Sequence, residues 1–139
     1  GVITFYRAQA ELILDYLMEI GVADRDPETG VVGIFSDQWK FTTNKSGDPV
    51  ERLRVDTVDA FQGKEFDVSM LSTVRTPGKN IAVADRAFGH LRIMNRLCVA
   101  LSRQRKLLII VGDRKSLVEH PLANTHIKPL CAFSEMCTK

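Results

Sequence analysis

A stretch of nine residues gathers hydroxyl, amide and carboxylate side chains around one glycine. It runs from Thr57 to Glu65 and places Gly63 between Gln62 and Lys64. Glycine permits a positive φ or a close approach of the backbone to a ligand. Ligands of open α/β sheets bind beyond the carboxyl ends of the strands, so the turn after Thr57 is a candidate site. The simpler alternative is a plain strand-to-helix connection in which Gly63 is only a turn residue.

A second cluster of polar residues lies on an expected helix and at its end, within residues 95–106. If Leu97 and Leu101 pack on a sheet, Arg96 and Arg103 project together from an adjoining face of that helix. The planar fork of a guanidinium suits phosphate better than a lysine does. The alternative is a solvated helix face whose last cations are favoured by the helix dipole.

Other kinds of site are not indicated by the sequence. It contains no phosphate loop of the G-x-x-x-x-G-K-[ST] type, so we expect that this chain does not bind and hydrolyse a nucleotide unaided. His120, His126, Cys131 and Cys137 lack the ligand spacing of a zinc site, and we expect no metal site. The histidines have no serine or cysteine partner that would make a nucleophile and base pair.

The charge of the chain is unevenly distributed. Residues 75–106 carry +7 and the remainder carries −5, which gives the net charge of +2. The segment contains one acid, Asp85, and eight basic residues: Arg75, Lys79, Arg86, Arg92, Arg96, Arg103, Arg105 and Lys106. A segregated positive segment indicates a polyanionic partner such as a phosphate backbone or a nucleotide. A merely solvated basic face is the alternative.

The length and composition favour one folded domain. A chain of 139 residues with 45% apolar and 26% charged residues is ordinary for a globular protein with its own core. No apolar run is long enough to cross a bilayer, and the first residues do not resemble a secretory signal, so we expect an intracellular protein without a membrane partner. We expect Cys98, Cys131 and Cys137, which are irregularly spaced, to be free thiols.

Hydrophobic periodicity predicts alternating strands and helices. The expected strands are residues 2–5, 53–57, 68–74 and 107–111, with a less regular one at 31–35, and the expected helices are 8–20 and 91–104. This order predicts an α/β fold with a mostly parallel sheet and helices on both faces. We expect residues 114–139 to form short peripheral helices along the edge.

Three blocks of the sequence, in this order, resemble the second RecA-like domain of superfamily 1 helicases, in the branch of the up-frameshift and senataxin-like enzymes. The blocks are residues 1–9, 55–67 and 95–103, and the strand ending in residues 109–113 follows them. The sequence departs from the family at Phe5, Asn95 and Ser102, where proline, arginine and threonine are common. Residues 22–50 do not align with it.

The resemblance implies a RecA-like P-loop NTPase fold that lacks its own Walker A loop, with residues 1–139 forming a single C-terminal motor domain. ATP would lie in the cleft between this domain and a first RecA-like domain of the same parent protein. That first domain would supply the phosphate loop and hold Mg²⁺.

The resemblance also implies roles for individual residues. Arg103 matches the arginine finger that reaches the γ-phosphate, where a fixed guanidinium stabilises developing charge. Gly63 and Glu65 match the turn that meets the γ-phosphate and the ribose. Gln62 would couple the binding of the nucleic-acid strand to that of the nucleotide, since it lies in sequence between the residues assigned to the two ligands. The positions that match contacts to a single strand of RNA or DNA, or that couple its binding to the nucleotide, are Thr4, Tyr6, Gln9 and Thr57.

These implications favour the C-terminal motor half of an ATP-dependent nucleic-acid helicase or translocase. The alternative is a non-catalytic nucleic-acid-binding or interaction module that retains the RecA-like fold. The presence of both Arg103 and Glu65 favours the motor, because a scaffold needs neither. A small nucleotide-binding enzyme that is complete in itself is disfavoured, because the sequence has no phosphate loop.

Overall fold

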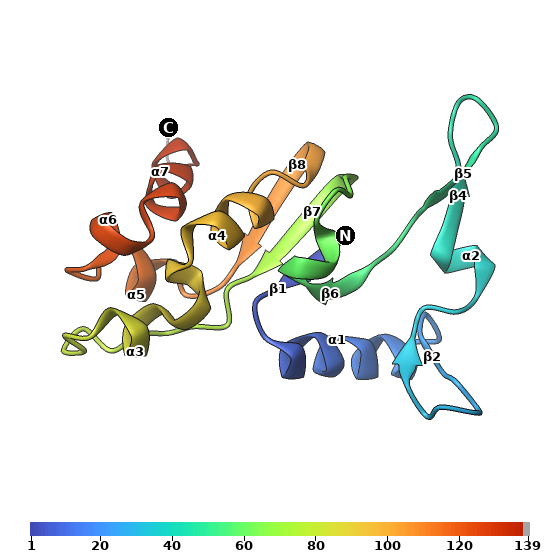
Figure 1. Cartoon of the computed structure of the whole chain (residues 1–139), viewed down its shortest axis with the longest axis horizontal. Helices are drawn as coiled ribbons and strands as arrows, with labels where there is room; N and C mark the ends of the chain where they lie inside the picture. Colours follow the sequence, from blue (N-terminus) through green and yellow to red (C-terminus); the bar gives the residue numbers. More distant parts are fainter. Residues whose placement is uncertain (138–139) are drawn as a thin grey trace.

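Four parallel strands form the central sheet, in the order β6-β1-β7-β8. The computed structural model describes residues 1–137 (Figure 1). The strands are β6 (Val55–Thr57), β1 (Val2–Thr4), β7 (Phe66–Ser72) and β8 (Gln104–Val111). Thr4 lies in register with Thr57 on one side and with Ser72 on the other, and Phe66 pairs with Gln104. We call the end of the sheet where β1, β6 and β7 finish, at Thr4, Thr57 and Ser72, the carboxyl edge. The opposite end, where β7 and β8 begin at Phe66 and Gln104, is the amino edge.

The predicted order of the main elements is confirmed, and with it the α/β RecA-like fold class. Helices lie on both sides of the sheet in Figure 1, with α1 (Arg7–Glu19) on one side and α4 (Met94–Ala100) on the other. The remaining helical elements are the 3₁₀ turns η1 (Val58–Phe61) and η2 (Gly89–Arg92) and the helices α2 (Asp37–Lys40), α3 (Ala84–Phe88), α5 (Arg114–Val118), α6 (Ala123–His126) and α7 (Lys128–Met136).

Helix α1 confirms the predicted helix but buries little of its apolar stripe. It is followed by Gly21, whose φ of 73° is a backbone conformation that favours glycine. Of its residues only Ala10 is buried, whereas Leu12 and Tyr16 are exposed. The helix contacts β6 and β1 of the sheet and also Val32–Gly33 outside it, so it shields only one part of the sheet. Periodicity therefore identified the helix, but not how much of its apolar surface has a partner.

Residues 22–54 leave the sheet and return to it. The expected strand at 31–35 is only β3 (Val32–Gly33), which pairs antiparallel with β2 (Asp24–Arg25) outside the central sheet. The next pair, β4 (Phe41–Thr43) and β5 (Pro49–Glu51), forms a hairpin that projects from the sheet in Figure 1. The predicted short strand at 31–35 is confirmed for two residues, and its pairing with β2 was not predicted because a short apolar run does not specify its pairing partner.

The core lies between the sheet and the helices that follow β7. It includes Ile3 and Leu71 from the sheet, Phe61 from η1 and Leu97 from α4, all fully buried. The helices after β8 were expected to be peripheral, but their residues Leu117, Ile127 and Leu130 are buried in the same core. They close the apolar face of the sheet because β7 and β8 need a cover there.

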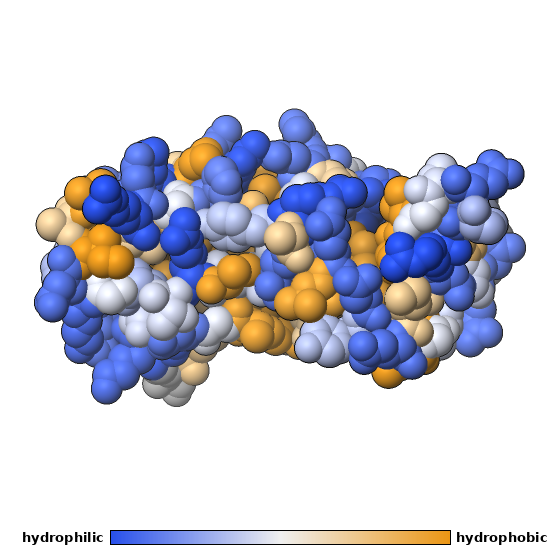
Figure 2. Space-filling view, turned by 90° about the horizontal axis from the view of Figure 1, so that it is seen from below, coloured by the Kyte–Doolittle hydropathy of each residue, from blue (hydrophilic) through white to orange (hydrophobic). Residues whose placement is uncertain are grey.

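The opposite face of β7 and β8 is apolar and open. Val68 and Met70 of β7 are exposed, as are Leu107 and Val111 of β8. Figure 2 shows apolar side chains gathered near the middle of the face seen from below. Among residues 1–137, no helix is long and apolar enough to cross a membrane.

Truncation of a core leucine should distinguish the two faces of the sheet. We expect Leu97→Ala to lower the free energy of unfolding by about 2–5 kcal/mol, because it leaves a cavity in the buried core. The matched control Leu107→Ala removes the same atoms from a side chain that is 49% exposed and should cost about 0.5 kcal/mol or less. Urea unfolding followed by circular dichroism measures both, and equal losses would contradict this assignment of the core.

Candidate functional site

The segment from Thr57 to Glu65 is divided between the two edges of the sheet. Thr57 ends β6 at the carboxyl edge, and η1 then carries the chain back along the sheet with Val58 and Phe61 buried. Gly63 and Glu65 consequently lie at the amino edge, just before β7. The expectation that the whole segment lies beyond the carboxyl ends of the strands was therefore wrong for its second half, because two apolar anchors fix the direction of η1.

The turn around Gly63 is open to solvent. Gly63 has a φ of 76°, and a Cβ added to it would meet no atom within 4 Å. Gln62, Lys64 and Glu65 are exposed on either side of it. A positive φ favours glycine here for the conformation of the turn rather than for lack of space.

Arg103 lies beside this turn. Helix α4 ends at Ala100, and the expected helix over 91–104 is shorter because the chain enters β8 at Gln104. The amide of Phe66 donates to the Arg103 carbonyl at 2.9 Å, so the pairing of β7 with β8 holds Arg103 next to the turn.

The guanidinium of Arg103 is bound only by neutral groups. Its Nε donates to the Val99 carbonyl at 3.0 Å, Nη1 donates to the Lys64 carbonyl at 3.2 Å and Nη2 donates to the Ser102 hydroxyl at 2.9 Å. The side chain is half-buried at the surface, outside the apolar core. No carboxylate of residues 1–137 forms an ion pair with it, so its charge is not neutralised within the domain.

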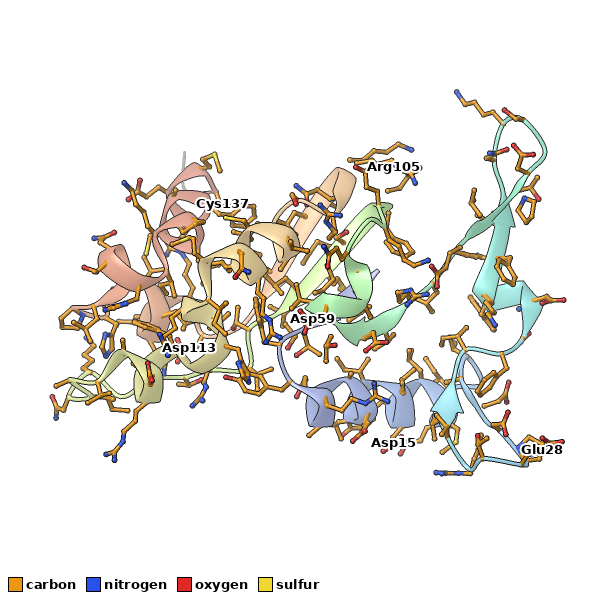
Figure 3. All side chains as sticks on the ribbon, in the orientation of Figure 1. Asp15, Glu28, Asp59, Arg105, Asp113 and Cys137 are labelled. Atoms are coloured by element: carbon orange, nitrogen blue, oxygen red, sulfur yellow. The ribbon has the colours of Figure 1, made fainter. Side chains whose placement is uncertain are left out.

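Glu65 has a cationic partner of its own. Arg105 Nε lies 3.6 Å from the Glu65 carboxylate, and Arg105 Nη2 donates to the Glu65 carbonyl at 3.0 Å. Figure 3 shows Arg105 near the amino end of β8. This ion pair orients the Glu65 carboxylate next to the turn at Gly63 and leaves the Glu65 side chain 59% exposed.

The two arginines that were predicted to project together both reach the segment between Thr57 and Glu65. Arg96 donates to the Asp59 carboxylate at 2.8 Å and so links α4 to η1; Asp59 is labelled in Figure 3. Arg103 donates to the Lys64 carbonyl. The sequence did not indicate that Asp59 would be the partner of Arg96, because 37 residues separate the two.

The carboxyl edge holds the residues expected to contact a nucleic-acid strand. Thr57 is half-buried, and its amide donates to the Asp56 carboxylate at 2.7 Å. Gln9 is half-buried in the first turn of α1. Tyr6 directs its hydroxyl to Arg75, whose Nε donates to it at 2.8 Å.

Thr4 does not have the exposed position that a strand contact would require. It is fully buried, and its hydroxyl accepts a hydrogen bond from the Tyr6 amide at 3.4 Å. Its side chain therefore holds the turn after β1, and the expected direct contact is not supported. Alternation along a strand predicts two faces, but it does not reveal that α1 and the neighbouring strands enclose this position.

Comparisons with known proteins give matches over most of the chain. A family described as "AAA domain" matches residues 1–115. The chain is 34% identical to ATP-dependent helicase NAM7 of Saccharomyces cerevisiae over 124 residues, which are 89% of this chain and 10% of that protein. The chain belongs to this AAA-domain family, in the up-frameshift branch of superfamily 1 helicases.

Two further relatives also match a part of their length to this chain. The chain is 32% identical to 5'-3' DNA helicase ZGRF1 of Mus musculus over 88% of this chain and 5% of that protein. It is 40% identical to NFX1-type zinc finger-containing protein 1 of Homo sapiens over 50% of this chain and 3% of that protein. The chain thus spans a tenth or less of the length of these relatives.

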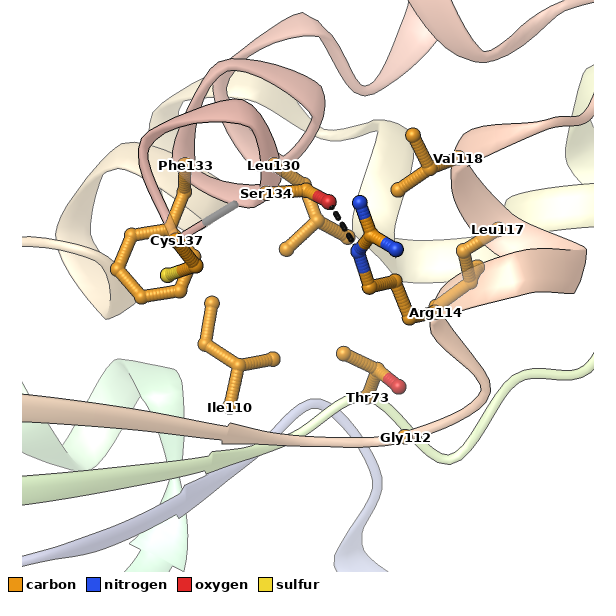
Figure 4. Close-up of a pocket in the computed structure, with 10 residues that line it drawn as sticks. All are labelled: Thr73, Ile110, Gly112, Arg114, Leu117, Val118, Leu130, Phe133, Ser134 and Cys137. Carbon is orange, nitrogen blue, oxygen red and sulfur yellow. Dashed lines mark hydrogen bonds between the residues drawn. The ribbon is translucent and has the colours of Figure 1, made fainter. Parts of the chain in front are cut away.

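The described part of the helicase-family domain has no cluster of metal ligands, but it has a cavity away from Arg103. Within residues 1–137, no group of three or more His, Cys, Asp or Glu side chains could hold a metal ion. A largely apolar cavity of about 160 Å³ lies between β8 and helices α5 and α7, with Arg114 donating to Ser134 at 2.6 Å on its wall (Figure 4). No sequence pattern predicted this cavity, which arises where α7 packs against the sheet.

Glu51 connects the hairpin β4–β5 to the turn around Gly63. Its carboxylate accepts hydrogen bonds from Arg54 at 2.8 Å and from Lys64 at 3.0 Å. Burial acts to raise the pKa of Glu51, but the hydrogen bonds and charges of Arg54 and Lys64 outweigh it and lower the pKa below its ordinary value of 4.5. The sequence analysis did not select Glu51, since nothing local marks it.

Removal of this carboxylate should weaken the domain in a pH-dependent manner. A lowered folded pKa means that Glu51 stabilises the fold above its unfolded pKa and that this contribution disappears as the pH falls through the folded pKa. We expect Glu51→Gln to lower the free energy of unfolding by about 0.5–1 kcal/mol at neutral pH, with a smaller loss below pH 4.5. Denaturant unfolding across this range measures it. The control Asp15→Asn changes an exposed acid and should give no such trend, and a pH-independent loss in Glu51→Gln would contradict the role of its charge.

Proposed function

We propose that this chain is the C-terminal motor domain of an ATP-dependent nucleic-acid helicase or translocase. It supplies an arginine finger, Arg103, to an ATP site shared with a first RecA-like domain. The observation that carries the proposal is a surface guanidinium with no carboxylate partner in residues 1–137, held by β8 beside the open turn at Gly63. Membership of the helicase family supports it, and so does the name of the yeast relative, an ATP-dependent helicase.

The hydrogen bonds of Arg103 suit a residue that changes partners. Carbonyl and hydroxyl oxygens hold its guanidinium in the isolated domain, and a phosphate oxygen can replace the Lys64 carbonyl and the Ser102 hydroxyl with stronger, charge-assisted bonds. The bond from Nε to the Val99 carbonyl can persist and keep the fork oriented. A pre-positioned guanidinium stabilises charge that builds on the transferred phosphoryl group.

The neighbouring residues then shape the nucleotide side of the cleft. Gly63 lets the turn approach the γ-phosphate without a side chain, and Glu65, oriented by Arg105, faces the ribose side. Gln62 lies on the same exposed turn and couples this edge to η1. Mg²⁺ would be held by the first domain, as the family resemblance implies.

ATP closes the cleft in this proposal because Arg103 and Glu65 bind the nucleotide only when the two domains approach. Hydrolysis removes the γ-phosphate and reopens the cleft. The carboxyl edge, where Thr57, Tyr6 and Gln9 lie, would hold a single strand of RNA or DNA, mainly through its phosphates. The rigid sheet connects the two edges, so closing at one moves the other.

Substitution of Arg103 should abolish hydrolysis but not nucleotide binding. In the full-length protein we expect Arg103→Ala to reduce the rate of strand-stimulated ATP hydrolysis by about 10³-fold or more, with ATP affinity largely retained. Phosphate release and binding of a fluorescent ATP analogue measure the two quantities. Lys106→Ala removes a nearby cation that Asp67 already neutralises and should leave hydrolysis nearly unchanged. Hydrolysis by Arg103→Ala at a near wild-type rate would refute the finger assignment.

The isolated chain should be inactive. We expect purified residues 1–139 to show no ATP hydrolysis and little ATP affinity, because the phosphate loop and the Mg²⁺ ligands belong to the other domain. Addition of a single-stranded oligonucleotide should not change this. Measurable turnover by this chain alone would reject its assignment as one half of a shared site.

A further inference from the structure

Most cations of the basic segment 75–106 are neutralised within the domain. Carboxylates within 4 Å pair with five of its eight basic residues: Lys79 with Glu119, Arg92 with Asp85, Arg96 with Asp59, Arg105 with Glu65 and Asp67, and Lys106 with Asp67. The three without a carboxylate among residues 1–137 are Arg75, Arg86 and Arg103. Arg103 lies at the amino edge, so Arg75 and Arg86 form a second, separate group.

Arg75 is held in place by an aromatic side chain. Its Nε donates to the Tyr6 hydroxyl at 2.8 Å, and its guanidinium carbon lies 5.4 Å from the centre of the Tyr6 ring. Nη1 reaches the Arg86 carbonyl at 3.5 Å, whereas Nη2 has no hydrogen-bond partner in residues 1–137. Arg75 therefore has a fixed orientation and donors that are still available.

The backbone around Arg75 is shaped to allow this position. Val74 has a φ of 63°, a strained conformation for a β-branched residue, and it directly precedes Arg75. On the other side, a Cβ added to Gly89 would lie 2.3 Å from the Tyr6 hydroxyl and 2.5 Å from Arg75 Nη2. Only glycine allows the chain at 89 to pass so close to this pair. Backbone strain of this kind concentrates at sites where a side chain must be presented in one way.

A pocket of about 370 Å³ opens beside Arg75. Its lining includes Tyr6, Arg75, Thr76 and Arg86, and no acidic side chain. The Arg86 side chain is exposed and makes no hydrogen bond or ion pair within residues 1–137. Two guanidiniums and a hydroxyl around a space without carboxylates fit a phosphate group, which accepts several charge-assisted hydrogen bonds.

The position of this pocket favours a phosphate of a nucleic-acid strand over a phosphate of the nucleotide. Arg75 follows the carboxyl end of β7, and Tyr6 follows the carboxyl end of β1, which pairs with β7 and, on its other side, with β6. The pocket thus lies at the same edge as Thr57, and the seven residues of β7, about 20 Å of strand, separate it from the turn of Arg103. A nucleotide bound at the amino edge does not reach it.

We propose that Arg75 and Arg86 bind one backbone phosphate of a single nucleic-acid strand in this pocket, and that Tyr6 positions Arg75. This inference rests on the proposed function, since it places a further contact on the same strand. It also changes the role of Tyr6. Its hydroxyl accepts hydrogen bonds from Arg75 Nε at 2.8 Å and, more weakly, from the His90 amide at 3.4 Å. Its ring packs against Arg75 and against His90, with 5.1 Å between the centres of the Tyr6 and His90 rings. Tyr6 thus acts through Arg75.

The test is the affinity of the full-length protein for a fluorescent single strand as a function of salt. Matched ribo- and deoxyribo-oligonucleotides are titrated by fluorescence polarisation with the wild type, Arg75→Gln and Arg86→Gln. Loss of one phosphate contact reduces the magnitude of the slope of log affinity against log salt by about 0.7 for a single strand. Because two arginines share the phosphate, we expect each variant to show part of that reduction and to bind about tenfold more weakly at moderate salt.

A matched control separates this site from general charge. Arg92→Gln removes an arginine of the same segment that Asp85 neutralises, so the affinity and the slope should change little. Tyr6→Phe keeps the ring but removes the hydroxyl, and it should weaken binding in the wild type but add nothing in Arg75→Gln. The melting temperature of every variant is compared with the wild type, and Arg86→Gln serves if Arg75→Gln is unstable, because its side chain is exposed.

Each outcome decides between the two proposals. Wild-type binding with unchanged slopes in both Arg75→Gln and Arg86→Gln overturns this inference and leaves the proposed function standing. Failure of the wild type to bind either kind of strand overturns both. Additive effects of Tyr6→Phe and Arg75→Gln overturn the positioning role of Tyr6. A reduced slope for the ribo-oligonucleotide alone or the deoxyribo-oligonucleotide alone supports the inference and identifies the strand.

Discussion

The placement of Arg103 and Arg75, two arginines without a carboxylate partner in residues 1–137, at opposite ends of the central sheet is the constraint on which the functional reading of this domain depends. A guanidinium that keeps its charge at a surface is available to an anion, whereas one paired with a carboxylate contributes mainly to structure. Arg103 lies at the amino edge, where β7 and β8 begin, and Arg75 lies at the carboxyl edge, beyond the end of β7. Strand β7 runs between them, with Leu71 fully buried and hydrogen-bonded neighbours on both sides.

The turn η1 makes this arrangement possible. It begins at Thr57 on the carboxyl edge and delivers the chain to Gly63 on the amino edge, and the buried side chains of Val58 and Phe61 hold it against the core. Arg96 fastens the same turn to α4 through Asp59. A displacement of α4 is therefore transmitted to η1, and η1 connects the two candidate ligand edges in only a few residues. In the proposed function, this short connection would couple the nucleotide to the nucleic-acid strand.

The hairpin β4–β5 adds a connection that the family resemblance did not include. Glu51 at its base binds Lys64, next to Gly63, and Arg54, whose Nη1 also reaches the Ala60 carbonyl at 3.4 Å. Glu51, the last residue of the hairpin, thus joins it by an ion pair to the turn that faces the nucleotide in our proposal. The exposed apolar side chains of β7 and β8, in contrast, have no described partner among residues 1–137.

The sequence by itself determined the order of strands and helices, the fold class and the family, because apolar periodicity and three ordered motifs are local properties of the chain. It also led to the prediction that Gly63, Glu65 and Arg103 act at one nucleotide site. Only the tertiary structure decided which arginines remain unpaired, since Asp59 is 37 residues from Arg96 and Tyr6 is 69 residues from Arg75. Likewise only the structure showed that Thr4 is buried and that the helices after β8 belong to the core. Burial and ion pairing depend on contacts between distant segments, and no spacing along the chain encodes them.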